Sequence, residues 1–434
     1  MKTWKMQVVA SAIVVAATLL LASTQRADFF GSSKPFTPPK GCVFRTVMGE
    51  ESSEKHNIYK TPERVQRALD LGLEWIVQAQ HLNGGWGAGS HHRQDIRNPH
   101  AVQTDPATTA MTAMAILRSG STLSSGPYSQ SLQKALEYIL TAVETSPDNT
   151  TNITNLNDTQ IQTKLGRNID VILASQFLSN IEEYVTKDDL RKRVRRAQEK
   201  CVQKIQNAQD DNGAIAGSGW AGVLQSSFAT NALEAAEAKG IEVDRASLEK
   251  ARQFQKNNYD AKTGSVNTDL GAGIVLYSVT GSVRASAKEA RRVEEEMEKA
   301  KRQGKLAPSA APTAENLQKI GFDKDDAMQY ATAYEVYQSA KVEAQKEDVM
   351  SGFGNNGGEE FLSYLQTGES MIINKDDSWQ NWYDNMSGRL LKIQNNDGSW
   401  SGHHCITSPV FCTATCLLIL SVNNDVERLI ELGG

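Results

Sequence analysis

Apolar and polar positions follow a helical spacing almost throughout the chain from Thr61 onward. Segments such as TPERVQRALDLGLEWIVQAQ place apolar residues three and four positions apart, which is the spacing of one face of an amphipathic helix. The chain has no sustained alternation of β-branched and polar residues, so a sheet protein is not expected. The pattern predicts an all-α fold.

The predicted helices are of two kinds that alternate. Charged, amphipathic helices are followed by helices with few charges, such as ATTAMTAMAIL after Asp105-Pro106 and VFCTATCLLIL after Ser408-Pro409. Asp-Pro and Ser-Pro are typical helix starts, with an N-cap residue and a proline in the first turn. An uncharged helix needs burial on all sides, so we expect inner helices over 107–117 and 411–420, inside an outer ring, with about 11–13 helices in all.

One layout recurs three times. An apolar residue is followed four positions later by Gln, and four positions after that by Gly in a turn, with Trp or Ile two residues further on. The residues of this repeat are Trp75, Gln80, Gly84, Trp86, Gln209, Gly213, Gln394, Gly398 and Trp400. We interpret each copy as a helix end, stopped by a glycine with positive φ and covered by the following Trp or Ile. The Gln side chain is expected to bind carbonyls of a neighbouring helix end and so to tie one repeat to the next.

This pattern resembles the Gln–Trp repeat of squalene and oxidosqualene cyclases, and it is similar to the repeats of protein prenyltransferase β subunits. The resemblance covers residues 61–425. It implies an α/α toroid, in which repeated helix pairs close into a ring. It also implies an apolar small molecule, such as an isoprenoid or another lipid, or a protein as the partner. A shared fold does not by itself imply a shared activity.

The catalytic motif of the cyclases is only partly present. Their Asp-x-Asp-Asp-Thr-Ala motif, whose middle Asp protonates the substrate, corresponds to residues 105–110. Asp105 matches the first acid, but Ala107 and Thr108 replace the other two, and an alanine has no proton to donate. Asp105 is therefore a candidate for a catalytic acid, but it is more simply explained as a helix N-cap. The zinc-binding Asp-x-Cys of the prenyltransferases is also missing before Cys412 and Cys416.

Five of the seven histidines lie in two loops, which the first and last repeats of a closed ring would bring together. The candidate metal ligands in these loops are His91, His92, His100, His403, His404 and Cys405. Imidazole and thiolate suit zinc or another transition metal. Their spacing matches no compact metal motif, so the alternative is a polar seam in which these side chains bind helix ends.

The ends of the chain and one internal segment predict its organisation. Lys2 and Lys5 precede an apolar run over 8–22, so residues 1–25 are predicted to be a signal peptide or, if uncleaved, an N-terminal membrane anchor, which makes the protein periplasmic or secreted. Residues 26–60 are read as a linker and 426–434 as a C-terminal tail. A charged segment followed by a Pro/Ala-rich one suggests a helical and linker excursion over 281–323.

Composition narrows the function without identifying it. The formal net charge of −5 gives no electrostatic reason to expect nucleic acid. The incomplete acid motif favours an exported binding or structural module. The alternatives are a terpenoid cyclase with an altered acid and a polysaccharide-active enzyme on the same toroid, for which export is the only support.

Overall fold

A computed structural model describes residues 59–354 and 356–432, and no strand occurs among them. Their sixteen α-helices exceed the expected 11–13 because four short ones lie in loops and at the C-terminal end. The six outer helices are α3 (Glu63–Gln78), α5 (Ser129–Thr145), α8 (Asp188–Asn207), α10 (Arg245–Lys256), α13 (Lys324–Ala344) and α16 (Trp379–Lys392). The six inner helices are α4 (Pro106–Arg118), α7 (Ile169–Ile181), α9 (Gly222–Ala238), α11 (Val275–Arg302), α15 (Gly358–Asn374) and α17 (Pro409–Leu420). The short helices are α6 (Gln160–Lys164), α12 (Ala314–Lys319), α14 (Glu347–Met350) and α18 (Val426–Leu432), with 3₁₀ turns η2 (His91–Arg93), η3 (Pro99–Ala101), η4 (Glu182–Tyr184), η5 (Asp269–Gly271) and η6 (Val422–Asp425).

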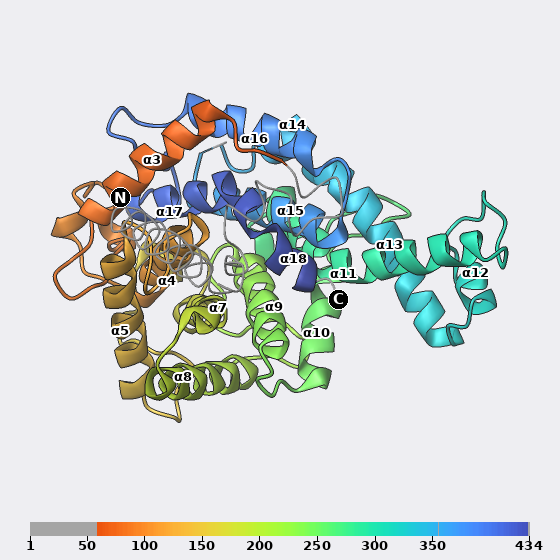
Figure 1. Ribbon diagram of the computed structural model, residues 1–434, viewed down its shortest axis with the longest axis horizontal. Coiled ribbons are helices and arrows are strands. Elements are labelled where there is room, and N and C mark those ends of the chain that lie inside the picture. The colour runs from red at the N-terminus through yellow and green to blue at the C-terminus, as the bar shows by residue number, and fades with distance from the viewer. Residues whose placement is uncertain (1–58, 355, 433–434) are drawn as a thin grey trace, which may run out of the picture. The chain divides into compact units, whose positions relative to one another are not determined.

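The inner helices close into a ring. Each packs against the next in the order α4, α7, α9, α11, α15 and α17, and α17 returns to contact α4 (Figure 1). Every inner helix also packs against an outer helix of its own, so six outer–inner pairs surround one axis. The chain is thus an α/α toroid, as the alternation of charged and uncharged helices predicted.

Burial separates the two rings. All residues of α7 and α15 are buried, and so is the predicted inner segment of α4 from Ala107 to Ile116, with Leu117 half-buried. The whole of 411–420 in α17 is buried as well. The outer helix α3 buries one stripe, which includes Val65, Leu69 and Ile76, and exposes its charged face. The low charge of α4, α7 and α17 therefore reflects their position between the axis and the outer ring.

The Trp residues of the repeat cover helix ends. The indole Nε1 of Trp86 donates to the carbonyl of Ile76 at 2.7 Å, and that of Trp400 donates to Leu390 at 2.9 Å. Both side chains are fully buried. Trp75, by contrast, is only half-buried against the core.

Each Gln of the repeat links one outer helix to the next. Gln80 Nε2 donates to the carbonyls of Gly84 and Ser131, and Ser131 lies in the first turn of α5. Gln209 binds Ser247 of α10 in the same way at 2.9 Å, and Gln394 binds Ala68 of α3 at 3.0 Å. We expected the Gln side chains to bind unsatisfied carbonyls at the C-terminal ends of helices. The carbonyls that they bind lie instead near helix starts, where a carbonyl also accepts a hydrogen bond within its own helix. The contact of Gln394 with α3 joins the last repeat to the first.

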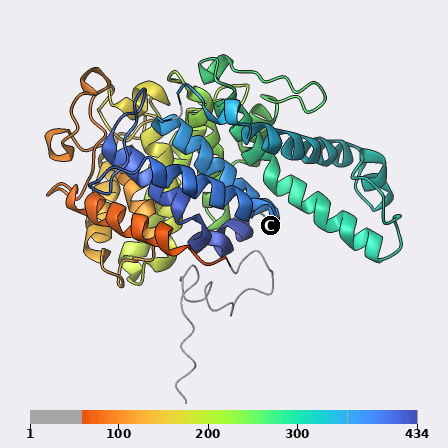
Figure 2. The ribbon, with the colours of Figure 1, turned by 90° about the horizontal axis from the view of Figure 1, so that it is seen from above.

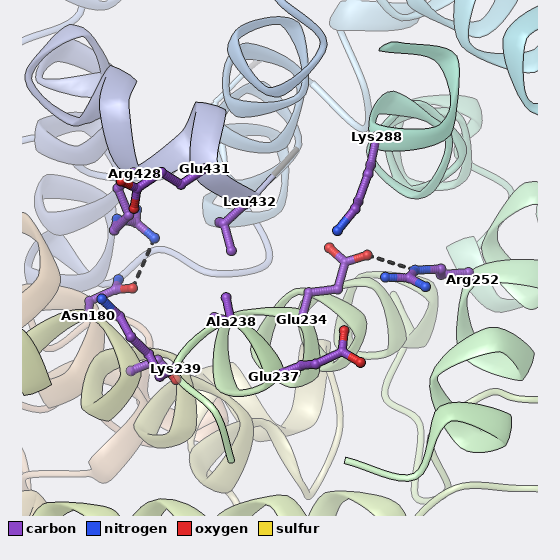
Figure 3. A pocket seen from close by; sticks show the side chains of 12 residues that line it. Asn180, Glu234, Glu237, Ala238, Lys239, Arg252, Lys288, Arg428, Glu431 and Leu432 are labelled. Carbon is purple, nitrogen blue, oxygen red and sulfur yellow. Dashed lines mark hydrogen bonds and ion pairs between the residues drawn. The ribbon is translucent and has the colours of Figure 1, made fainter. Parts of the chain in front are cut away.

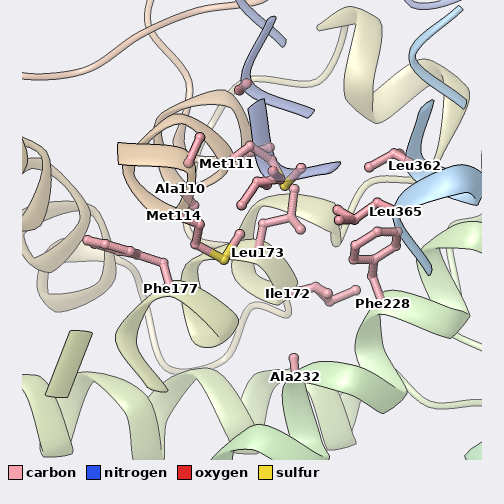
Figure 4. Packing of buried hydrophobic residues seen from close by; sticks show 14 of the residues in the cluster. Ala110, Met111, Met114, Ile172, Leu173, Phe177, Phe228, Ala232, Leu362 and Leu365 are labelled. Carbon is pink, nitrogen blue, oxygen red and sulfur yellow. The ribbon is translucent and has the colours of Figure 1, made fainter. Parts of the chain in front are cut away.

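The centre of the ring is filled by apolar side chains. Met111, Met114, Leu173, Phe228 and Leu365 project from four inner helices and are at most 5% exposed (Figure 4). They belong to the same buried cluster as the outer–inner contacts. Dispersion contacts and apolar burial therefore stabilise the axis of the ring as they do its walls.

The excursion is a helical hairpin with a small core of its own. The first half of α11 lies in the inner ring and is buried as far as Ala287, so the excursion begins later than 281. Its second half, α12 and the start of α13 project from the ring (Figure 2). Met297, Leu317 and Ala327 pack together inside this hairpin.

The C-terminal segment differs from the expected tail. Residues 426–432 form α18, in which Leu429 is 1% exposed, and Arg291 of α11 donates to the carbonyl of Ile430 at 2.6 Å. The segment is therefore part of the fold. The predicted signal peptide, and the linker apart from residues 59–60, lie outside the described residues. Among the described residues no single helix is long and apolar enough to span a membrane; only the bent pair Pro409–Leu420 and Val422–Leu432 passes on length and composition, and α17 is core.

Candidate ligand site at the mouth of the ring

The inner helices all begin at one end of the ring, which we call the mouth. Two buried carboxylates from adjacent inner helices meet there. Asp105 is the N-cap of α4, and its oxygens accept from the amides of Thr108 at 2.7 Å and Ala88 at 2.9 Å. Asp170, in the first turn of α7, accepts from the amide of Ala107 at 3.0 Å and from Gln162 Nε2 at 2.6 Å. Both acids therefore satisfy the free amides at the start of α4.

Burial raises the pKa of both carboxyl groups. The pKa of Asp105 rises to about 6, and that of Asp170, which also feels the charge of Asp105, rises to about 7. Raised values of this kind occur in catalytic acids, but here every carboxylate oxygen already has a donor. Asp105 is placed as a cap, and Asp170 caps the neighbouring helix rather than its own.

The candidate metal ligands do not converge on one point. His100 Nε2 lies 3.1 Å from the carbonyl of Gln78, and His91 Nδ1 lies 2.9 Å from Gln94 Nε2. The rings of His91 and His92 contact each other, whereas the His404 ring contacts Phe353. Within the described part of the chain, no three His, Cys, Asp or Glu side chains are placed to hold a metal ion together. The zinc site stays a prediction from the sequence that this arrangement does not support.

The first and last loops do meet, through other residues. Gln94 donates to the carbonyl of Cys405 at 2.9 Å, and Arg97 donates to that of Thr407 at 2.5 Å. Gln160, 1% exposed, donates to the carbonyl of Ala88 and accepts from the amides of Thr407 and Ser408. These contacts make the seam of the ring polar and largely backbone-directed.

A row of ionisable side chains crosses the mouth beyond this seam. Lys164, at the end of α6, lies 4.3 Å from the ring centroid of Trp220. Lys164 also acts electrostatically on Glu359 and Cys405. Glu359 accepts from the amide of Ile406 at 3.2 Å. Lys164 is 5% exposed and Trp220 is 65% exposed, so the row begins at the surface and runs inward.

The row continues with Glu360, which is fully buried. One of its oxygens accepts from Tyr277 and from the amide of Phe353, and the other has no hydrogen-bond donor among the described residues. That second oxygen is 3.9 Å from His404 Nε2, and neither ring nitrogen of His404 has another partner in the described part. Phe353, 61% exposed, contacts the His404 ring and ends the row at the surface again.

The electrostatics of the row follow from burial. Burial and then the charge of Glu360 raise the pKa of Glu359 to about 8, so Glu359 is largely neutral near pH 7. Burial and then Glu359 raise the pKa of the Cys405 thiol to about 12, so this thiol is not an activated nucleophile. Cys405 has a φ of 55°, an uncommon conformation for a residue with a side chain.

The other end of the ring holds a cavity of about 260 Å³ (Figure 3). Its main feature is Glu234, whose carboxylate binds Arg252 at 2.8 Å and Arg284 at 2.9 Å, with Lys288 beside it. Burial alone would raise the pKa of Glu234, but the two arginines outweigh it and hold the pKa at about 2. Arg428 donates to Asn180 at 3.0 Å. Acids and bases in this cavity largely neutralise one another, so it offers no clear ligand chemistry.

The sequence identified part of this site. Asp105 and the two histidine-bearing loops were found from their motifs and their places in the repeat. Lys164, Trp220, Glu359 and Glu360 were not connected, because they come from three repeats with no shared spacing. A signal did exist in the pair Glu359-Glu360, since two adjacent acids at the start of a mostly uncharged helix are unusual for a buried segment.

No protein-family model matches the sequence, and no curated protein matches it. One similar solved structure is an alanine variant of the type II terpene cyclase MstE from Scytonema, in complex with its product merosterolic acid A. The alignment has a TM-score of 0.42 and 12% identity, and it covers 84% of this chain and 97% of that one.

Proposed function

We propose that this chain is a ligand-binding protein on an α/α toroid, which takes its ligand at the mouth and does not cyclise isoprenoids. The observation that carries this proposal is the filled axis of the ring. A cyclase must enclose its substrate in a cavity free of water. Here Met111, Leu173, Phe228 and Leu365 occupy the centre of the ring and are at most 3% exposed.

The position of Asp105 supports the same proposal. An acid that protonates a substrate must lie within hydrogen-bond reach of the accepting atom. Both oxygens of Asp105 instead accept hydrogen bonds, from the amide of Ala88 and from the amide and hydroxyl of Thr108 in the first turn of α4. Replacing Asp105 would therefore be expected to affect folding rather than a reaction.

Product analysis tests the proposal. The purified chain is incubated separately with squalene and with farnesyl diphosphate, and the extracts are analysed by gas chromatography and mass spectrometry. We expect no cyclised product from either compound. A cyclised hydrocarbon formed by the wild type and lost in a folded Asp105→Asn variant would overturn the proposal and make Asp105 the acid.

A second candidate, a polysaccharide-active enzyme, is favoured by the adjacent carboxyl groups of Glu359 and Glu360. Glycoside hydrolysis uses one protonated and one ionised carboxyl, and the pKa of about 8 suits Glu359 to the acid role. Against it, the two residues are 1% and 0% exposed, so a glycosidic oxygen does not reach them in this structure. Release of reducing ends from polygalacturonate, abolished by Glu359→Gln, would establish this activity; no release leaves binding as the function.

A further inference from the structure

The ammonium of Lys164 has no hydrogen-bond acceptor among the described residues. Its side chain belongs to a residue that is only 5% exposed, and among the described residues its ammonium donates no hydrogen bond. Its ammonium lies over the Trp220 ring, 4.3 Å from the ring centroid. A cation–π contact leaves the N–H donors of the ammonium free to bind an anion.

No neighbouring acid fully neutralises this charge. Glu359 interacts electrostatically with Lys164, but its pKa of about 8 leaves it mostly protonated near pH 7. Lys164 therefore keeps a charge that can bind an anion.

The exposed rings of Trp220 and Phe353 indicate a second property of the ligand, an apolar face. They are 65% and 61% exposed and stand at the two ends of the row of ionisable groups. A large aromatic ring left in water beside polar groups suits a ligand that has both an apolar face and polar edges. A pyranose ring has such a face of C–H groups, and its hydroxyl groups can reach the neighbouring polar side chains.

We propose that the mouth binds an anionic carbohydrate, with a carboxylate or sulfate group on Lys164 and a sugar ring on Trp220. This inference rests on the proposed binding function and specifies its ligand. A single-stranded nucleic acid would also combine anions with stacking, but it requires a run of cations along its backbone. Of the cations at the mouth, Arg97 already binds backbone carbonyls and Lys164 has no acceptor among the described residues, and the chain has a formal net charge of −5, so the carbohydrate is favoured.

Calorimetric titration of the full chain tests the inference. The probes are trigalacturonate, a heparin tetrasaccharide, neutral maltotriose, oligothymidylate and inorganic sulfate. The variants are Lys164→Met and Trp220→Ala, with controls Lys187→Met and Met328→Ala at exposed positions away from the mouth. Circular dichroism and thermal unfolding establish that each variant is folded.

We expect at least one anionic saccharide to bind more tightly than maltotriose, with the choice between trigalacturonate and heparin separating carboxylate from sulfate. Lys164→Met should weaken that binding by about tenfold or more, because it removes a charge-assisted contact, and Trp220→Ala should also weaken it. The controls should bind like the wild type.

The inference is overturned if neither anionic saccharide binds, if folded Lys164→Met binds as well as the wild type, or if sulfate or oligothymidylate binds as tightly as the saccharides. Calorimetry tests this inference, whereas product analysis tests the proposed function. A failure of the inference can therefore be distinguished from a failure of the proposed function, which requires a cyclised hydrocarbon.

Discussion

The indole of Trp86 donates its N–H to the carbonyl of Ile76 at 2.7 Å and thereby closes the end of helix α3. Trp400, near the other end of the ring-forming sequence, repeats this contact on the carbonyl of Leu390. In both cases the amide of the Trp also donates to a hydroxyl of the following inner helix, Thr109 or Thr413. One aromatic residue thus joins the end of an outer helix to the next inner helix.

Trp86→Ala should lower the free energy of unfolding by about 3–5 kcal/mol, because it removes a fully buried indole. Chemical denaturation measures the change. Leu82→Ala, at a fully exposed position in the same loop, is the control and should change stability by less than about 0.5 kcal/mol. A loss below about 1 kcal/mol for Trp86→Ala would show that the repeat does not stabilise this chain.

The glycine of the repeat should be required for close approach of two outer helices. At Gly213 (φ +93°), a Cβ would lie 2.2 Å from the carbonyl oxygen of Lys250 in α10. Gly264 has a similar φ of +72° but open space around it. Gly264→Ala should cost about 1 kcal/mol for backbone strain alone, and Gly213→Ala about 1–3 kcal/mol more. Equal losses in the two variants, measured by denaturation, would contradict a packing role for Gly213.

Gln160 should stabilise the seam of the ring. Gln160→Leu removes the partners of one carbonyl and two amides, those of Ala88, Thr407 and Ser408, and should cost about 2–4 kcal/mol. Amide hydrogen exchange at Thr407 and Ser408 should accelerate in the variant. Unchanged protection of these amides would mean that the seam is held by other contacts.

Stability should fall as pH rises from 5 to 8. The folded-state pKa values of Asp105 and Asp170 lie above the ordinary value near 3.8, so the folded state holds protons that the unfolded state releases. That contribution is complete below pH 4 and is lost as pH rises through about 6 and 7. Glu359, with a pKa of about 8, acts in the same direction, whereas the lowered pKa of His91 acts in the opposite one.

Comparison of wild type and Asp170→Asn isolates this effect. Asparagine does not titrate, so the variant should lose less stability between pH 5 and pH 8 than the wild type does. Urea denaturation at each pH gives the two slopes. Identical slopes would show that Asp170 keeps an ordinary pKa in the folded protein.

The fold was predictable because burial acts on whole helices. The uncharged segments after Asp105-Pro106 and Ser408-Pro409 predicted two inner helices, and the Gln–Gly spacing predicted how outer helices end. Three of the six pairs lack that spacing, yet they complete the ring because neighbouring helices leave apolar faces uncovered. The hydroxyls that bind the Trp amides were missed, since a Thr inside an apolar helix has no distinctive pattern.

The site was less predictable because a ring brings together residues that share no spacing. The histidines were predicted to join the first and last loops because imidazole is a common metal ligand. In the structure, Gln94, Arg97 and Gln160 make the contacts between these loops. Nothing in the sequence around Lys164 distinguishes it from the other lysines. Its low exposure depends on the position of Trp220 in the folded chain. Only the closed ring brings Lys164 within electrostatic reach of Glu359.

Quenching of Trp220 fluorescence by acrylamide tests most directly whether the ligand binds at the mouth. Trp220 is the most exposed tryptophan of the described residues, so the difference between wild type and Trp220→Phe reports its accessibility. The account predicts that the anionic saccharide selected by calorimetry shields Trp220 from acrylamide in the wild type, and that maltotriose at the same concentration does not. Saccharide binding that leaves the quenching of Trp220 unchanged would contradict a ligand site at the mouth.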